Sequence, residues 1–166
     1  MNTGINAAKA APASLIGALD TLAREATTAS GLMDSIVSLL HEALKNYNWV
    51  GFYMLEKGVG EDVLVLGPFR GAATPHTRIP LNQGICGAAA SSGETVVVDD
   101  VGSDARYLAC SLETKSEIVV PIFAASKVVG ELDIDSQVPA AFGGEDRLLC
   151  EHVARLVGRW LEAQPE

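Results

Sequence analysis

Hydrophobic residues at helical spacing mark both ends of the chain. Behind Ser14, apolar side chains recur every three or four positions through residues 15–22, and a second series behind Ser30 runs over residues 32–44. Serine is a favoured N-cap residue, so we expect one helix to begin after each of these serines. A third apolar stripe, over residues 145–161, predicts a long helix that closes the chain.

The middle of the chain favours β-strands. Apolar runs separated by turn residues predict strands over residues 49–55, 62–66, 95–98, 117–123 and 128–134. Gly67-Pro68 is expected to end or bend the second strand, and the last two strands form a hairpin around residues 125–127. Between these strands, residues 82–92 predict a small helix and residues 99–112 predict a loop.

Helices, then antiparallel strands, then a helix are typical of the α+β class. We therefore expect a central antiparallel sheet with the N- and C-terminal helices on one face. Loops and the small middle helix would cover a ligand pocket on the other face.

Composition narrows the class of protein. The 166 residues suffice for one domain, which we place at residues 14–166 behind a flexible N-terminal tail at residues 1–13. Lys and Arg number 12 against 21 Asp and Glu, and a net charge of −9 argues against nucleic acid as a partner. No apolar run is long enough to span a membrane. Three cysteines do not fit a secreted disulfide scaffold, so a cytoplasmic protein is expected.

Acidic side chains alternate along one predicted strand. Glu131, Asp133 and Asp135 share one face because side chains in a strand point to opposite sides in turn. Glu117, on the neighbouring strand of the hairpin, could face Asp133 or Asp135. One interpretation is a solvated strand end. The other is a site for an ammonium group, a metal ion or a shared proton.

An aromatic strand offers a second candidate. Trp49, Gly51 and Tyr53 share one face, and the opposite face is also apolar, which predicts a central strand. Simple core packing would explain this pattern. Alternatively, the glycine opens a gap in which a small ligand could lie between the two rings.

The three cysteines fall in different contexts. Cys86 stands at the start of the small helix, where the helix dipole would lower its pKa, although a small buried side chain is the alternative. Cys110 lies in the predicted loop, and Cys150 belongs to the core stripe of the last helix. A thiol beside a carboxylic acid suits reduction of a polarised S=O bond, because the thiolate attacks sulfur while the acid protonates oxygen.

Seven short strings then carry a resemblance to a known family. They are Asn48-Trp49-Val50-Gly51-Phe52-Tyr53, Leu64-Val65-Leu66-Gly67-Pro68-Phe69, Arg78-Ile79-Pro80, Gly84-Ile85-Cys86-Gly87, Ala109-Cys110, Ser116-Glu117-Ile118-Val119-Val120-Pro121 and Leu132-Asp133-Ile134-Asp135-Ser136. Together they resemble the free methionine-(R)-sulfoxide reductases, which are stand-alone GAF domains. The similarity covers residues 32–161.

The resemblance implies roles for the thiols. Cys110 matches the catalytic cysteine, which attacks the sulfoxide sulfur of free methionine-(R)-sulfoxide and becomes a sulfenic acid. Cys86 matches a resolving cysteine that condenses with it to a disulfide. Thioredoxin is the implied external reductant, and no bound cofactor is implied.

The resemblance also implies a binding site. Trp49 and Tyr53 match the aromatic wall around the methyl-sulfoxide end of the substrate. Glu117, Asp133 and Asp135 match acids that hold the substrate ammonium or polarise the sulfoxide oxygen, with Glu117 and Asp135 assigned to catalysis as well. Members of the family dimerise, and the sequence leaves this open for the present chain.

One position departs from the family pattern. His76 stands where the family usually has a further cysteine, so Cys86 is expected to be the sole resolving thiol. The alternative function is a non-catalytic GAF domain that senses a small ligand, which would not need Cys86 and Cys110. A metal site built from His76, Cys86 and Cys110 matches no standard zinc spacing, so no metal is expected.

Overall fold

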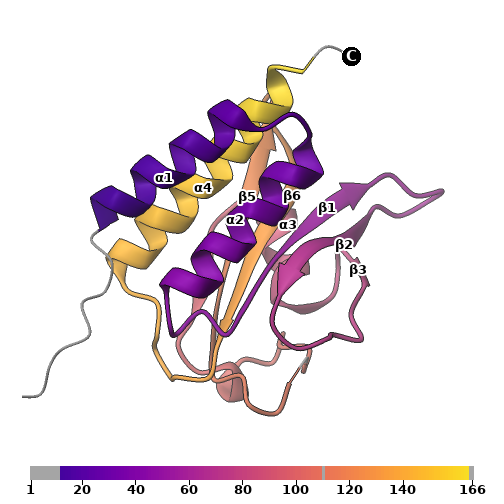
Figure 1. Cartoon of the computed structure of the whole chain (residues 1–166). Coiled ribbons are helices and arrows are strands. Elements are labelled where there is room, and N and C mark those ends of the chain that lie inside the picture. The colour runs from indigo at the N-terminus through magenta and orange to yellow at the C-terminus, as the bar shows by residue number, and fades with distance from the viewer. Residues whose placement is uncertain (1–11, 110, 165–166) are drawn as a thin grey trace, which may run out of the picture.

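The computed structural model describes residues 12–109 and 111–164. A six-stranded antiparallel sheet in the order β3-β2-β1-β6-β5-β4 forms the centre of this part of the chain (Figure 1). The strands are β1 (Trp49–Glu56), β2 (Val63–Arg70), β3 (Arg78–Pro80), β4 (Val96–Val98), β5 (Ser116–Ala124) and β6 (Lys127–Ser136). The helices are α1 (Pro12–Glu25), α2 (Ala29–Ala43), α3 (Gly84–Ser92), the short 3-10 helix η1 (Val101–Ser103) and α4 (Gly144–Glu162). The expected α+β class is confirmed.

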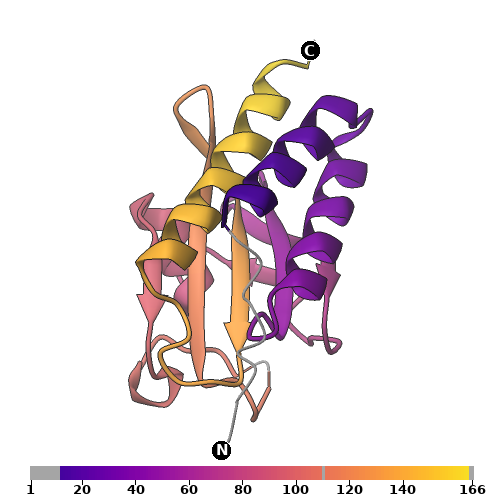
Figure 2. The ribbon, with the colours of Figure 1, turned by 60° about the vertical axis from the view of Figure 1, so that its left-hand side comes forward.

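The helices are divided between the two faces of the sheet. Figures 1 and 2 show α1, α2 and α4 side by side over one face, where α4 packs on β5 and α2 on β1 and β2. The small helix α3 lies over β5 and β6 on the other face. This is the predicted arrangement. No helix within the described residues is long and apolar enough to cross a membrane.

Alternation along the central strands supplies two separate cores. Val50 and Phe52 on β1 are buried with Leu132 and Ile134 on β6 against the three large helices. Their neighbours of opposite parity face α3, where Trp49 and Tyr53 join a second buried cluster with Cys86. The β1 strand is therefore apolar on both faces, as predicted for a central strand.

The β5–β6 hairpin fixes the register of the acidic strand. Ala124 pairs with Lys127, so Ala125 and Ser126 alone form the turn, with φ of 48° and 64°. Positive φ at both positions is typical of a type I′ turn, whose twist matches that of the flanking strands. The predicted hairpin is confirmed, and its register determines which side chains meet across the ladder.

Several predicted boundaries are wrong. The second helix begins behind Thr28 instead of Ser30, because the Thr28 hydroxyl accepts a hydrogen bond from the backbone N–H of Gly31 at 3.0 Å. The first helix already includes Pro12, which is tolerated in a first turn because its missing N–H would have no partner there. The expected tail at residues 1–13 otherwise lies outside the described residues.

The second strand also runs further than predicted. Gly67-Pro68 does not end β2, because the register between β1 and β2 shifts between Gly51 and Tyr53. Such a bulge leaves residues outside the regular ladder, so a proline without an N–H can be accommodated. The three-residue β3, which pairs with the start of β2, was not predicted.

Candidate active site

Four carboxyl groups are buried together on the sheet face that α3 covers. Glu131, Asp133 and Asp135 on β6 are only 0%, 4% and 5% exposed, and Glu117 on β5 is 5% exposed. Glu117 stands directly opposite Asp135 across the ladder. The interpretation as a solvated strand end is therefore wrong. The described residues include no buried Lys, Arg or His that would balance these charges.

Burial changes the acidity of this cluster. It raises the pKa of Glu131 and Asp135 well above the usual carboxyl range, and the neighbouring charge of Asp133 adds to both shifts. Burial also raises the pKa of Asp133 to about 6, against hydrogen bonds with Glu117 and Cys86 that lower it. A carboxyl with such a pKa can exchange a proton near neutral pH, so the cluster can hold either protons or a cationic group.

Four oxygens of the cluster lack hydrogen-bond partners within the described part of the chain. They are both carboxyl oxygens of Glu131, Oδ1 of Asp133 and Oδ1 of Asp135. A buried polar atom without a partner costs free energy. The cluster is thus poised to bind a ligand that supplies positive charge or hydrogen-bond donors.

Cys86 lies over this cluster. The Cys86 thiol donates a hydrogen bond to Oδ2 of Asp133 at 3.4 Å and is 5% exposed. Burial, followed by the negative charges of Asp133, Glu131 and Glu117, raises the pKa of the thiol well above its usual value. The expectation that the helix dipole lowers this pKa is therefore wrong, because desolvation and three carboxyls outweigh a partial charge of about 0.5 at the helix start.

Two glycines let α3 bring Cys86 close to the sheet. Gly84 begins the helix with a φ of 71°, a conformation that L-residues rarely adopt. At Gly87, an added Cβ would lie 2.7 Å from the carbonyl oxygen of Leu81. The absence of side chains at these positions therefore determines how closely α3 approaches β6.

The aromatic residues stand beside the acids but do not leave the predicted gap. Trp49 and Tyr53 on β1 are paired with Asp135 and Glu131 on β6. The Trp49 indole lies over Gly51, where a Cβ would collide with it, so no ligand fits between the two rings there. Instead, Trp49 stacks on Tyr53 with a centroid distance of 6.2 Å.

Sequence reasoning missed a third ring in this stack. Phe69 on β2 lies 5.6 Å from Trp49, centroid to centroid, with the rings 19° from parallel. The Trp49 indole N–H also donates to the Ala72 carbonyl at 3.0 Å. Phe69 belongs to one of the strings that carry the resemblance, but the strand predicted over residues 62–66 stops short of it.

His76 connects the site with the segment before Cys110. The Tyr53 hydroxyl donates to the His76 carbonyl at 2.7 Å, and the His76 Nε2 lies 3.2 Å from the Ala109 carbonyl oxygen. His76 is half-buried and lines the cavity. Cys110 itself lies outside the described residues, and its role and its pairing with Cys86 stay predictions.

A small cavity joins these groups. It is lined by Tyr53, His76, Ile79, Gly84, Ile85, Cys86, Leu108, Glu117 and Asp133. Its volume of about 20 Å³ exceeds the roughly 10–15 Å³ that one water molecule needs, but it is too small for an amino acid. Cys86, Glu117 and Asp133 each offer a ligand atom here, all within 4.8 Å of one another.

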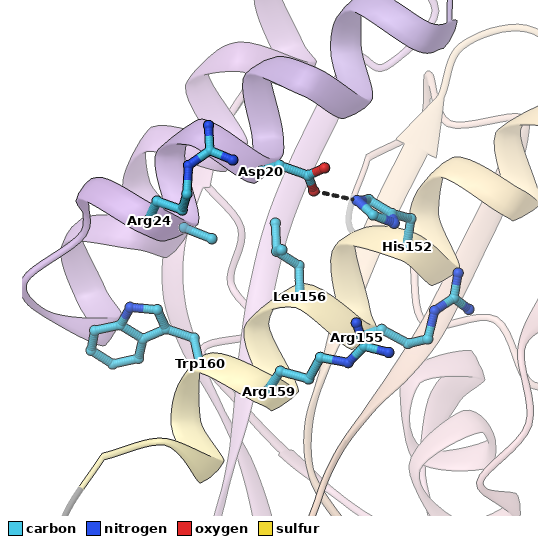
Figure 3. A pocket seen from close by; sticks show the side chains of 8 residues that line it. Asp20, Arg24, His152, Arg155, Leu156, Arg159 and Trp160 are labelled. Carbon is cyan, nitrogen blue, oxygen red and sulfur yellow. Dashed lines mark hydrogen bonds and ion pairs between the residues drawn. The ribbon is translucent and has the colours of Figure 1, made fainter.

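A larger cleft lies on the helical face, between α1 and α4 (Figure 3). It has a volume of about 450 Å³, and three arginines line it, Arg24 from α1 with Arg155 and Arg159 from α4. His152 Nε2 forms an ion pair with Asp20 Oδ1 there at 2.9 Å. Its lining includes neither thiol nor buried carboxyl cluster, so the smaller cavity is the candidate active site.

The third thiol behaves as predicted. Cys150 on α4 is fully buried in the helical core, 3.8 Å from the Tyr47 hydroxyl oxygen. Burial raises its pKa to about 12, which leaves it protonated at neutral pH. Its assignment to the core is confirmed.

Comparison with known proteins places these features in a family context. A sequence model of the GAF domain matches residues 14–160. The free methionine-R-sulfoxide reductase of Escherichia coli is 41% identical over 109 residues, covering 66% of this chain and 63% of that protein's length. The Saccharomyces cerevisiae protein of the same name is 39% identical over 127 residues, covering 74% of this chain and 69% of that protein.

A solved structure extends the comparison to the fold. The free methionine-R-sulfoxide reductase of Neisseria meningitidis, solved in complex with its substrate, superposes with a TM-score of 0.85. It is 35% identical, and the match covers 92% of this chain and 89% of that one.

Proposed function

Given that the chain belongs to the free methionine-R-sulfoxide reductases, a family of GAF-domain proteins, we propose that it reduces free methionine-R-sulfoxide to methionine. The membership confirms the resemblance and the GAF-like fold that the sequence motifs predicted. The observation that carries the proposal is the buried carboxyl cluster with the Cys86 thiol 3.4 Å from Asp133.

The carboxyl cluster accounts for recognition of the free amino acid. Free methionine sulfoxide carries an ammonium group, which is absent when the amine is part of a peptide bond. Glu117, Asp133 and Asp135 are buried together, and Oδ1 of Asp133 and Oδ1 of Asp135 lack hydrogen-bond partners within the described part of the chain. An ammonium group would supply positive charge and hydrogen-bond donors to these two oxygens. A protonated carboxyl of the same cluster can donate its proton to the sulfoxide oxygen.

Two thiols complete the redox chemistry. Cys110 attacks the substrate sulfur, the S=O bond breaks, and the oxygen passes to Cys110, which leaves methionine and a Cys110 sulfenic acid. The substrate sulfur gains the two electrons that Cys110 loses. Cys86 then attacks the sulfenic sulfur, and a Cys86–Cys110 disulfide forms as water leaves. Asp133 lies within reach to accept the Cys86 proton in that step.

Thioredoxin would return the enzyme to its reduced form. Its two thiols reduce the Cys86–Cys110 disulfide by thiol–disulfide exchange and are themselves oxidised to a disulfide. Because His76 replaces the family's further cysteine, the proposed relay passes directly from Cys86 to thioredoxin.

A thioredoxin-coupled assay tests the proposal. NADPH consumption is followed with the reduced protein and free methionine-R-sulfoxide, the S epimer, or the N-acetylated R form. We expect turnover of the free R form only, because acetylation removes the ammonium group. No turnover of the free R form contradicts the proposal, and binding without turnover would indicate the non-catalytic ligand-binding alternative.

A further inference from the structure

We propose that the reduced protein binds one zinc ion between Cys86, Glu117 and Asp133. These residues come from three elements, α3, β5 and β6, and each offers one ligand atom within 4.8 Å of the other two. The Cys86 Sγ and Asp133 Oδ2 are 3.4 Å apart. A tetrahedral zinc with usual Zn–S and Zn–O bond lengths separates two such atoms by about 3.5 Å. The thiol and the Asp133 carboxyl therefore already stand at the spacing of two zinc ligands.

The surroundings of these atoms favour a cation independently of their spacing. All three side chains are buried, and Oδ1 of Asp133 has no hydrogen-bond partner within the described part of the chain. Glu131, directly below on the same strand face, adds a further buried carboxyl with both oxygens unpartnered. A divalent ion would offset the mutual repulsion of the Asp133 and Glu131 carboxyls and supply a partner to their unpartnered oxygens.

The cavity has the size of an ion and its first water. Its volume of about 20 Å³ excludes larger ligands in this conformation. Three protein ligands and one water make the usual four-coordinate zinc site with an open position. This ligand set is invisible in the sequence, because the residues are 31 and 16 positions apart and no standard zinc spacing connects them.

The Cys86 thiol determines which metal ion the proposed site prefers. Thiolate ligands favour Zn²⁺ over the hard cations Mg²⁺ and Ca²⁺, which prefer six or more oxygen ligands. On binding, the S–H bond of Cys86 breaks, its proton leaves to solvent, and an S–Zn bond forms with no change in oxidation state.

Zinc bound at this position would inhibit the proposed sulfoxide reduction. It would occupy the thiol assigned to resolution and two acids assigned to the substrate ammonium, so zinc and free methionine sulfoxide would exclude each other. This consequence rests on the proposed function, whereas the binding itself does not. Zinc would also shield Cys86 from oxidation, because the thiolate electrons are engaged with the metal.

Titration of the whole reduced, metal-free chain tests the site. Isothermal titration calorimetry with Zn²⁺ should show one ion per chain, and Mg²⁺ should bind at least 100-fold more weakly. Cys86→Ser and Glu117→Gln should each weaken zinc binding at least 10-fold. Cys150→Ala, which alters a thiol in the other core, should leave it within about 2-fold.

A spectroscopic readout separates ligand loss from misfolding. Co²⁺ in place of zinc should give a thiolate charge-transfer absorption that disappears in Cys86→Ser and persists in Cys150→Ala. If Cys86→Ser folds with an unchanged circular dichroism spectrum and still binds zinc as tightly, the proposal is wrong. Absence of binding to the reduced wild-type chain overturns it as well. Neither result depends on sulfoxide turnover, so a failure here and a failure of the proposed function are distinguishable.

Discussion

At Asp133, burial and hydrogen bonding shift the pKa in opposite directions. Burial raises its pKa to about 6. Because this folded-state pKa lies above the unfolded value of about 3.9, the folded chain binds more protons between the two, and its stability falls as pH rises through about 6. We expect the free energy of unfolding to drop by about 1 kcal/mol from this residue between pH 5 and pH 7. Glu131 and Asp135 add drops of the same sign.

Urea unfolding at several pH values, with a chelator present, measures this effect. Asp133→Asn should flatten the pH dependence and raise stability at pH 8, because it removes a buried charge. Glu61→Gln, which changes an exposed acid in the β1–β2 turn, is the matched control and should keep the wild-type profile. Stability that rises from pH 5 to pH 8 in the wild type would contradict the buried-charge interpretation.

The two active-site thiols should fail in different ways. Cys110→Ser removes the proposed attacking thiol, so no methionine should form. Cys86→Ser keeps the attack but removes the resolving thiol, so it should release about one methionine per chain and then stop. Cys150→Ala should turn over at the wild-type rate. Quantifying methionine after a single cycle checks all three, and normal thioredoxin recycling of Cys86→Ser would show that another residue resolves the sulfenic acid.

At the level of single residues, the sequence predicted the sheet face of a side chain better than its burial. Alternation along one strand correctly placed Glu131, Asp133 and Asp135 on one face. Their burial could not be predicted, because it depends on α3 and the segment near Leu108 covering that face. The prediction of a lowered pKa for Cys86 was wrong for the same reason, since burial and carboxyls from β5 and β6 raise it.

Among the elements, α3 determines the geometry of the site by its distance from the sheet. Gly87→Ala should push it outward, because the new Cβ would lie 2.7 Å from the Leu81 carbonyl oxygen. We expect a loss of about 1–3 kcal/mol in stability and a lower kcat, because Cys86 moves with the helix. Gly17→Ala on the exposed face of α1 meets nothing within 4 Å and should be neutral or stabilising by up to ~1 kcal/mol.

Urea midpoints and steady-state kinetics of the two variants test this role of α3. The comparison isolates close packing, since both substitutions add the same methyl group to a helix. Equal stabilities of the two variants would mean that α3 can shift without cost. A Gly87→Ala variant that loses stability but keeps its kcat would show that the site tolerates the displacement of Cys86.

Most helices and strands were predictable from the sequence. Errors arose where tertiary contacts outweigh the preferences of neighbouring residues. The three large helices, α3 and the β5–β6 hairpin follow from periodicity and turn residues. Pro68 argued locally for the end of β2, but the bulge opposite Phe52 removes the need for its N–H. The short β3 carries only one fully buried side chain, Ile79, so it leaves little pattern to detect.

At the scale of the whole molecule, the sheet separates the larger hydrophobic core from the candidate active site. The larger core lies against α1, α2 and α4, and the candidate active site lies on the opposite face with α3. Leu40→Ala in the larger core should therefore cost about 2–5 kcal/mol while leaving kcat/KM within about 2-fold at temperatures where the variant is folded. The division into two faces was predictable from alternation, but the small size of the cavity under α3 was not.

In contrast to Leu40, Leu108 should affect access to the candidate site more than the stability of the fold. Its side chain covers Gly84 at the start of α3 and lines a cavity that is too small for an amino acid. We therefore expect the segment around Leu108 to move outward when methionine sulfoxide binds. Leu108→Ala should cost less than about 1 kcal/mol, because the residue is only half-buried, and should expose Cys86. Mass spectrometry of the Cys86 peptide after iodoacetamide treatment should show alkylation at least several-fold faster than in the wild type or in Leu40→Ala. An unchanged rate would mean that a different segment controls access to the thiol.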